Sequence, residues 1–275
     1  MRAVRRSAPH GRAARLLSYV LAALMAIQAA VGLLVPSVYR DADWAKAAWF
    51  GNDIVTLVVA VPLLTGALFI SRRGSRRADL VWFSMLGYAL YNYAYYVFGA
   101  RMNELFLLYI VLFVLPVVIL VLALGSYDAT ALAAGASSRT PRRWVSGYMA
   151  LTGVGLAVAW SAQWAGWVFG GAEPAIGEEA FALIAALDLS LMVPYFVLGA
   201  VLLWRRRPWG YLLATVMCLK GATYTLVLTV SSAVAAARGM AGGAAQVPVW
   251  AAWTLAGAAA ASALLVGQTP GREPR

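Results

Sequence analysis

Apolar residues fill most of the chain in long stretches, and short polar or charged segments separate them. Eight such stretches have roughly 20 residues or more, the length that an α-helix needs to cross the hydrocarbon core of a bilayer. They cover residues 15–35, 53–71, 79–100, 104–124, 145–169, 181–204, 209–237 and 247–267. The pattern predicts an all-α, polytopic membrane protein with eight transmembrane helices.

The basic residues gather on one side of these spans, which predicts the orientation of the chain. With the N-terminus in the cytoplasm, the cytoplasmic segments hold 17 of the 22 Lys and Arg residues. These segments are 1–15, 71–79, 125–144, 205–208 and 268–275. Because short cytoplasmic loops of membrane proteins are rich in Lys and Arg, we expect a cell-membrane protein with both termini in the cytoplasm. The net charge of +11 then reflects orientation and attraction to anionic membrane lipids, and we expect no nucleic-acid partner.

Composition supports this class and excludes several chemistries. Hydrophobic residues make up 63% and charged residues 12% of the 275 residues, against about 45–50% and about 25% in soluble domains. The one histidine, His10, precedes the first span, and the one cysteine, Cys218, lies inside the seventh. A His-based triad, a haem or di-iron site with His ligands, a disulfide and a Cys zinc site are excluded. We expect no cofactor and no metal.

An internal repeat relates the two halves of the chain. At a constant offset of 135 residues, the matching pairs are Gln28 and Gln163, Ala30 and Ala165, Asp53 and Asp188, and Arg72 and Arg207. Both halves begin on the same side, which predicts two parallel four-helix repeats rather than inverted ones. The first half is 1–124 with a cytoplasmic tail 1–14, the linker is 125–144, the second half is 145–267 and the C-terminal tail is 268–275. The alternative is chance similarity between apolar sequences.

Among the charged residues of the predicted spans, we single out Asp53, Asp188 and Lys220. A charged side chain at the centre of a transmembrane helix costs about 2.5–3.5 kcal/mol on insertion scales, so each needs a partner or a wet cavity. Asp188 and Lys220 come to similar depths, and we predict an ion pair between them; the alternative is a pair that only fixes helix packing. Asp53 has two interpretations. Either it lies with Asp188 near the pseudo-twofold axis of the two halves and transfers a proton or binds a cation, or it only interacts favourably with the dipole at the N-terminus of its helix. All three are candidate catalytic residues.

Aromatic and polar side chains recur at helical spacing in the third and fifth spans. Each set shares one helix face: Tyr88, Tyr91, Asn92 and Tyr95 in one span, and Trp160, Gln163, Trp164 and Trp167 in the other. We predict a polar, aromatic-lined pocket reached from outside, although such stripes also serve packing and the aromatic belt. The candidate substrate-binding residues are Tyr91, Asn92, Tyr95, Trp160, Gln163, Trp164, Tyr195 and Tyr224. Arg101, Asn103 and Glu104 form either its rim or a solvated turn.

One short motif resembles a known family. Asp188 is followed, after a five-residue gap, by Pro194 and Tyr195, which resembles one helix of the four-helix emopamil-binding (EXPERA) membrane proteins. That family includes a sterol isomerase and sterol-binding or drug-binding members, whose intramembrane acids face a hydrophobic ligand. The resemblance covers eight residues and implies a lipid-like ligand near Asp188. The first half departs from the motif, because Pro62 follows Asp53 three residues later than the motif requires.

Three functions of different classes fit these features. The first is a pocket that binds or converts a hydrophobic, lipid- or isoprenoid-like ligand by acid–base chemistry, with aromatic faces that also stabilise a cationic intermediate. The second is a small transporter coupled to protons through Asp53, Asp188 and Lys220. The third is a structural membrane subunit without a site, in which the polar residues only specify packing. The oligomeric state does not follow from the sequence.

Overall fold

A computed structural model describes residues 9–125, 127–137, 140–174 and 176–268. Residues 1–8 and 269–275 of the predicted tails, and 126 and 138–139 of the predicted linker, lie outside the described residues. The helices in chain order are α1 (Pro9–Leu34), η1 (Pro36–Val38), α2 (Asp43–Val55), η2 (Thr56–Ala60), α3 (Val61–Ser71), α4 (Arg76–Gly99), α5 (Phe106–Leu124), α6 (Ala129–Ala134), α7 (Arg142–Gly170), α8 (Glu178–Leu187), η3 (Asp188–Met192), α9 (Val193–Trp204), α10 (Pro208–Ala237) and α11 (Gly243–Val266). The described chain contains no β-strand, which confirms the all-α class.

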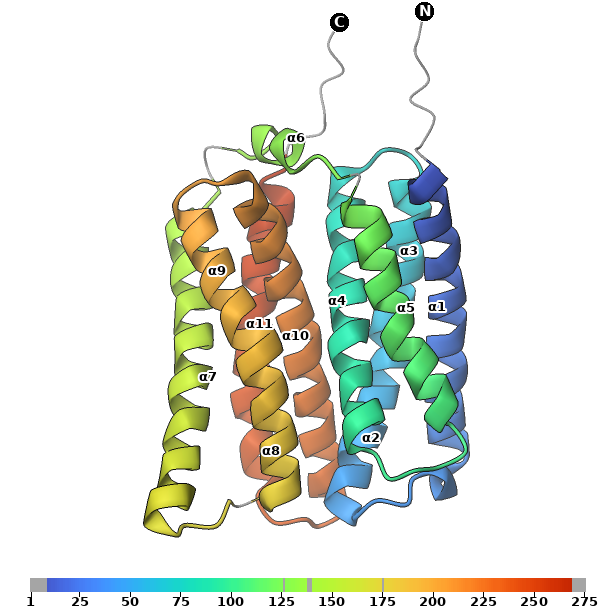
Figure 1. The fold of residues 1–275 in the computed structure, drawn as a ribbon, viewed down its shortest axis with the longest axis vertical. Coiled ribbons are helices and arrows are strands. Elements are labelled where there is room, and N and C mark those ends of the chain that lie inside the picture. The colour runs from blue at the N-terminus through green and yellow to red at the C-terminus, as the bar shows by residue number, and fades with distance from the viewer. Residues whose placement is uncertain (1–8, 126, 138–139, 175, 269–275) are drawn as a thin grey trace, which may run out of the picture.

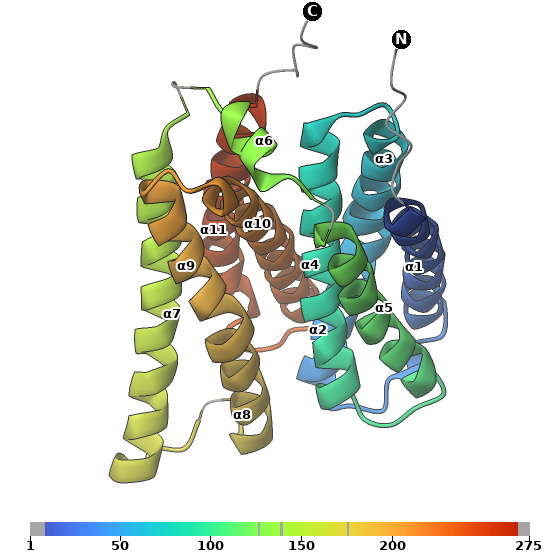
Figure 2. The same cartoon turned by 45° about the horizontal axis from the view of Figure 1, so that its top comes forward.

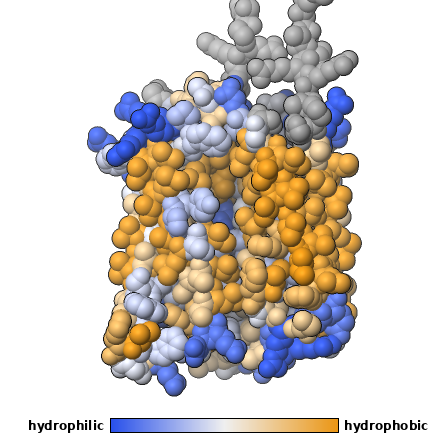
Figure 3. Space-filling model, viewed as in Figure 1, coloured by the Kyte–Doolittle hydropathy of each residue, from blue (hydrophilic) through white to orange (hydrophobic). Residues whose placement is uncertain are grey.

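Seven helical segments of the described chain are long and apolar enough to cross a membrane. They are Gly11–Leu34, Asp43–Ser71, Phe106–Leu124, Arg142–Gly170, Glu178–Trp204, Pro208–Ala237 and Gly243–Val266. They overlap seven of the eight predicted spans, but the second begins at Asp43, ten residues before its predicted start, so Asp53 does not open it. Figure 3 shows an apolar band between hydrophilic ends. Helix α4 is long enough but is not among them, because tyrosines and Asn92 lower its hydropathy. Most of α4 is buried by the surrounding helices.

Two of the spans contain a π-helical turn before a proline. η2 joins α2 to α3, η3 joins α8 to α9, and each ends two residues before a proline, Pro62 or Pro194. Proline lacks an N–H and crowds the preceding turn, and a π turn accommodates this locally. Both spans therefore continue through their prolines, and the second π turn begins at Asp188.

The long helices stand side by side in two groups. Figures 1 and 2 show α1, α2–α3, α4 and α5 in one group and α7, α8–α9, α10 and α11 in the other. Helix α10 joins the groups, because it packs against α2 and α4 as well as against α9 and α11. The start of α1 and the end of α11 lie at the same end of the bundle (Figure 1).

The segment between the two groups crosses that end of the bundle. α6 lies over it (Figure 2), and the Ser137 amide donates to the Gly267 carbonyl at 2.7 Å. Arg77 of α4 donates through Nε to the Gln268 carbonyl at 3.0 Å. These bonds hold the end of α11 against the first group of helices.

Candidate functional site

Asp53 lies at the centre of a hydrogen-bonded cluster inside the first group of helices, and its side chain is fully buried. Oδ1 accepts from Gln28 Nε2 at 3.0 Å and from the Tyr96 hydroxyl at 2.8 Å. Oδ2 accepts from the Tyr39 hydroxyl at 2.5 Å. The Tyr93 hydroxyl donates to Gln28 Oε1 at 3.0 Å and so orients the amide. We call these five residues the Asp53 cluster.

The Asp53 cluster is closed by tight packing. Gly32 of α1 faces the Asp53 carboxylate and the Tyr39 hydroxyl, and a Cβ at this position would collide with both. The ring of Trp49 lies against that of Tyr96, with centroids 4.6 Å apart. A buried carboxylate with three donors is stabilised by those donors, and Asp53 has them in Gln28, Tyr39 and Tyr96.

Asp188 forms a second cluster, between the two groups of helices. Oδ1 accepts from the Tyr91 hydroxyl of α4, and Oδ2 accepts from Trp160 Nε1 of α7 at 2.8 Å. The Tyr91 and Tyr95 hydroxyls are 3.0 Å apart. The ring of Tyr224 from α10 packs edge-on against Tyr91 and is stacked on Tyr95.

Lys220 completes this second cluster without an ion pair. Its Nζ lies 3.6 Å from the centroid of the Tyr91 ring and contacts Met192 Sδ, and only 3% of the residue is exposed. Among the described residues the ion pairs are Arg40–Glu104 and Lys46–Asp43, so the predicted Asp188–Lys220 pair is wrong. Instead, Tyr91 and Trp160 donate hydrogen bonds to the Asp188 carboxylate, and the Lys220 ammonium lies over the ring of Tyr91.

Tyr91 therefore links the two charges. Its hydroxyl donates a hydrogen bond to Asp188, and the face of its ring lies against Lys220. A cation over an aromatic face is attracted by the ring quadrupole, more strongly where water is excluded. We call Asp188, Tyr91, Tyr95, Trp160, Lys220, Met192 and Tyr224 the Asp188 cluster.

The remaining predicted site residues lie elsewhere. Gln163, Trp164 and Tyr195 are exposed on the outer surfaces of α7 and α9, and the structure does not bring them to the cluster. Asn92 is fully buried on α4, beside Tyr91 in sequence. Asp53 and Asp188 occupy separate clusters on different sides of α4 and do not meet at a shared axis.

The loop after α4 lies beside the first group of helices. The Arg101 amide donates to Asp41 Oδ1 at 2.9 Å, and Asn103 Nδ2 donates to the Tyr109 hydroxyl at 3.3 Å. Glu104 pairs with Arg40. These contacts join two loops at one end of the bundle and do not form a rim around Asp188.

Sequence reasoning missed Tyr39, Tyr96 and Met192. Tyr39 follows the short helix η1, outside every periodic segment, so no pattern identifies it. Tyr96 extends the tyrosine-rich run of α4 by one position, and the density of tyrosines there was the available signal. Met192 is one of eight methionines in the chain, and nothing in its position distinguishes it.

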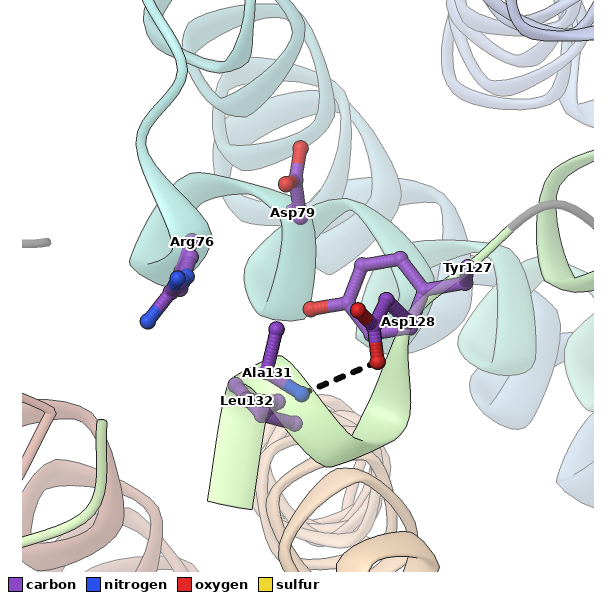
Figure 4. Close-up of a pocket in the computed structure, with 6 residues that line it drawn as sticks. All are labelled: Arg76, Asp79, Tyr127, Asp128, Ala131 and Leu132. Carbon is purple, nitrogen blue, oxygen red and sulfur yellow. Dashed lines mark hydrogen bonds between the residues drawn. The ribbon is translucent and has the colours of Figure 1, made fainter. Parts of the chain in front are cut away.

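A separate hollow of about 310 Å³ lies at the end of the bundle that carries α6 (Figure 4). Its lining residues are Arg76, Asp79, Tyr127, Asp128, Ala131 and Leu132. Asp128 accepts from the Ala131 amide at 2.9 Å and caps α6. Burial, together with the charge of Asp79, raises the pKa of the Tyr127 phenol, so this hydroxyl keeps its proton. None of the predicted site residues lines this hollow.

In the described part of the chain, no three His, Cys, Asp or Glu side chains come together in a way that could hold a metal ion. Comparison with known protein families, curated proteins and solved structures gives no match.

Proposed function

We propose that this chain is an eight-span protein of the cell membrane, built as two parallel four-helix repeats with cytoplasmic termini. The side-by-side helix groups of Figure 1 support the division into halves. The length of α4 and its burial among apolar helices support it as the eighth span. The excess of Lys and Arg on the side of the termini supports the orientation.

Within this frame, the Asp188 cluster is the binding site for a hydrophobic, lipid- or isoprenoid-like ligand with a polar group. The observation that carries the proposal is how Trp160 reaches Asp188. The buried residues of α7 are Val145, Ser146, Met149 and Gly153, all in its first half. Trp160 belongs to the second half, which has no fully buried residue, and yet donates to the Asp188 carboxylate.

This arrangement gives Asp188 an approach from the lipid side. A ligand that slides between α7 and the η3 turn meets apolar surface first, including the exposed Leu189. Its polar group then displaces or joins Trp160 at Asp188 Oδ2. The Asp53 cluster has no such approach, because both carboxylate oxygens are enclosed by buried side chains.

The cluster also contains the groups that acid–base chemistry needs. Asp188 accepts or donates the proton, and the Tyr91 and Tyr95 hydroxyls, 3.0 Å apart, extend a path for it. Lys220 favours the ionised form of Asp188 through its charge. The faces of Tyr91, Tyr95 and Tyr224 hold the apolar body of the ligand and stabilise positive charge on it.

A proton-coupled transporter is the second candidate. The observation in its favour is the π-helical turn that follows Asp53 in one half and begins at Asp188 in the other. Such turns mark places where a helix changes its hydrogen bonding, as alternating access requires.

The test is to identify what co-purifies with the protein. Native mass spectrometry and lipidomics of detergent-extracted protein are expected to find one class of hydrophobic molecule in excess over bulk lipid. Asp188→Asn is expected to lose it with an unchanged yield of folded protein, and Trp160→Phe to weaken its retention. Thr65→Ala is the control, because Thr65 lies on α3 in the other group of helices and its hydroxyl bonds to the Val61 and Pro62 carbonyls of its own helix.

Two results contradict the proposal. One is a wild-type protein that carries only bulk lipid in unselected proportions. The other is an Asp188→Asn variant that keeps its ligand, or that loses protein and ligand together while Trp160→Phe behaves as wild type. Proton-driven uptake of a water-soluble solute by liposomes containing the protein would instead favour the transporter.

A further inference from the structure

Asn92 of α4 is the most completely buried amide whose polar atoms lack partners. Its side chain is 0% exposed, and neither Nδ2 nor Oδ1 has a hydrogen-bond partner among the described residues. Because both atoms lack one, this holds whichever way the amide is turned. A buried polar group without a partner is costly, so native structures supply one.

The neighbours of Asn92 along α4 show which way it faces. Tyr91 and Tyr95 pack against Tyr224 of α10. Tyr96 donates to Asp53 of α2 at 2.8 Å. Asn92 lies between these two directions on the helix, so it faces the line along which α2, α4 and α10 meet.

Two more buried polar atoms without partners come from α2. They are Asn52 Oδ1 and Trp49 Nε1. Asn52 stands between Gly51, which packs on Ser231 of α10, and Asp53, which binds Tyr96 of α4. We call the line between α2, α4 and α10 at Asn52 and Asn92 the central seam.

The chemistry of these atoms selects the ligand. Asn92 Nδ2 and Trp49 Nε1 are donors, and Asn52 Oδ1 and Asn92 Oδ1 are acceptors. A metal cation satisfies only the acceptors, and an anion satisfies only the donors. Water both donates and accepts, and buried water typically makes about three hydrogen bonds to groups of this kind.

We propose that the central seam binds ordered water through Asn92, Asn52 and Trp49, and that this water joins the Asp53 and Asp188 clusters into one network. The rest of the path is already present in the protein. Tyr96 reaches Asp53, and Tyr91 reaches Asp188, from either side of Asn92 on the same helix. The seam water gives Asp53, which is closed on its other sides, a route for proton exchange toward Asp188.

The first experiment detects the water. In hydroxyl-radical footprinting by X-ray radiolysis, radicals form from water in place and label side chains beside bound water. Trp49 and Tyr96 are expected to be labelled although they are buried, and Tyr109, also buried, serves as the internal reference. In Asn92→Leu the labelling of Trp49 and Tyr96 is expected to fall while that of Tyr109 stays unchanged.

A matched control lies on the same helix. Ser84 is fully buried, and its hydroxyl already donates to the Leu80 carbonyl at 2.7 Å, so Ser84→Ala should leave the labelling of Trp49 and Tyr96 unchanged. If Asn92→Leu does not fold, Asn92→Ser leaves more room for water and should keep or increase the labelling. Wild-type protein without labelling at Trp49 and Tyr96, or unchanged labelling in Asn92→Leu, overturns the proposal.

The second experiment tests the connection between the clusters. Asp53→Asn, Asp188→Asn and the double variant are unfolded in parallel, in the wild-type and Asn92→Leu backgrounds. Sites without shared partners have additive effects on stability. We expect the effects of Asp53→Asn and Asp188→Asn on the free energy of unfolding to be non-additive in the wild-type background and additive in the Asn92→Leu background. Additivity in both backgrounds refutes the connection.

Discussion

Replacement of Tyr39 by phenylalanine tests whether the Asp53 carboxylate is held as an anion. The substitution removes one hydroxyl from a buried ring and keeps its shape. The lost donor lies 2.5 Å from Asp53 Oδ2. Gln28 Nε2 donates to the Tyr39 hydroxyl at 3.2 Å, so the proton of that hydroxyl is directed to Asp53.

The expected magnitude follows from the charge of the acceptor. A hydrogen bond to a charged group contributes about 1.5–3 kcal/mol to stability, and a neutral one about 0.5–1.5 kcal/mol. Tyr93→Phe is the matched control, because the buried Tyr93 hydroxyl donates at 3.0 Å to the neutral Gln28 Oε1. We expect Tyr39→Phe to cost about 1.4 kcal/mol more than Tyr93→Phe, roughly a tenfold difference in the unfolding equilibrium.

Unfolding of detergent-purified protein in increasing SDS, followed by tryptophan fluorescence, measures both variants against wild type. Equal losses of stability in Tyr39→Phe and Tyr93→Phe would mean that Asp53 acts as a neutral acceptor. A smaller loss in Tyr39→Phe would refute the assignment of Tyr39 as the donor that closes the Asp53 cluster.

Two further substitutions separate packing from charge. Gly32→Ala should lower the thermal midpoint and the yield of the protein, because the added Cβ would collide with the Tyr39 hydroxyl. Gly155→Ala, which has open space around it, should be neutral or stabilising. Equal effects of the two substitutions would contradict the close packing at Gly32. Lys220→Met should keep or raise the thermal midpoint, since it replaces a buried cation that makes no direct salt bridge with an apolar chain of similar length. A clear fall in that midpoint would show that the ammonium over Tyr91 stabilises the fold.

The apolar pattern of the sequence predicts the helices well, because a bilayer leaves few alternatives for backbone hydrogen bonds. It also places Asp53, Asp188 and Lys220 among the buried residues. It does not predict which of these side chains are in contact, because the contacts depend on the order in which the helices stand side by side and on their tilt. Asp188 and Lys220 come to similar depths, but Tyr91 lies between the carboxylate and the ammonium.

The repeat shows the same limit. Gln28 and Gln163 are 135 residues apart, and the predicted repeat treats them as equivalent positions. Gln28 is fully buried and binds Asp53, whereas Gln163 is exposed and bonds to the Ala159 carbonyl of its own helix. The difference arises because that half of α7 has no buried residue. The two glutamines that the predicted repeat pairs therefore have different surroundings.

Many of the buried tyrosines and Asn92 lie on one helix, α4, and the burial of this helix explains why. A helix that meets lipid cannot carry many polar side chains, and α4 is the long helix that the others cover most completely. It alone supplies tyrosine hydroxyls to both carboxylates, through Tyr96 to Asp53 and Tyr91 to Asp188. Because the two tyrosines are five residues apart on one rigid helix, a shift of α4 that lengthens one contact also moves the other. If the proposed ligand binds at Asp188 and moves α4, we expect the hydrogen bond between Tyr96 and Asp53 to change as well, although the two carboxylates are not in contact.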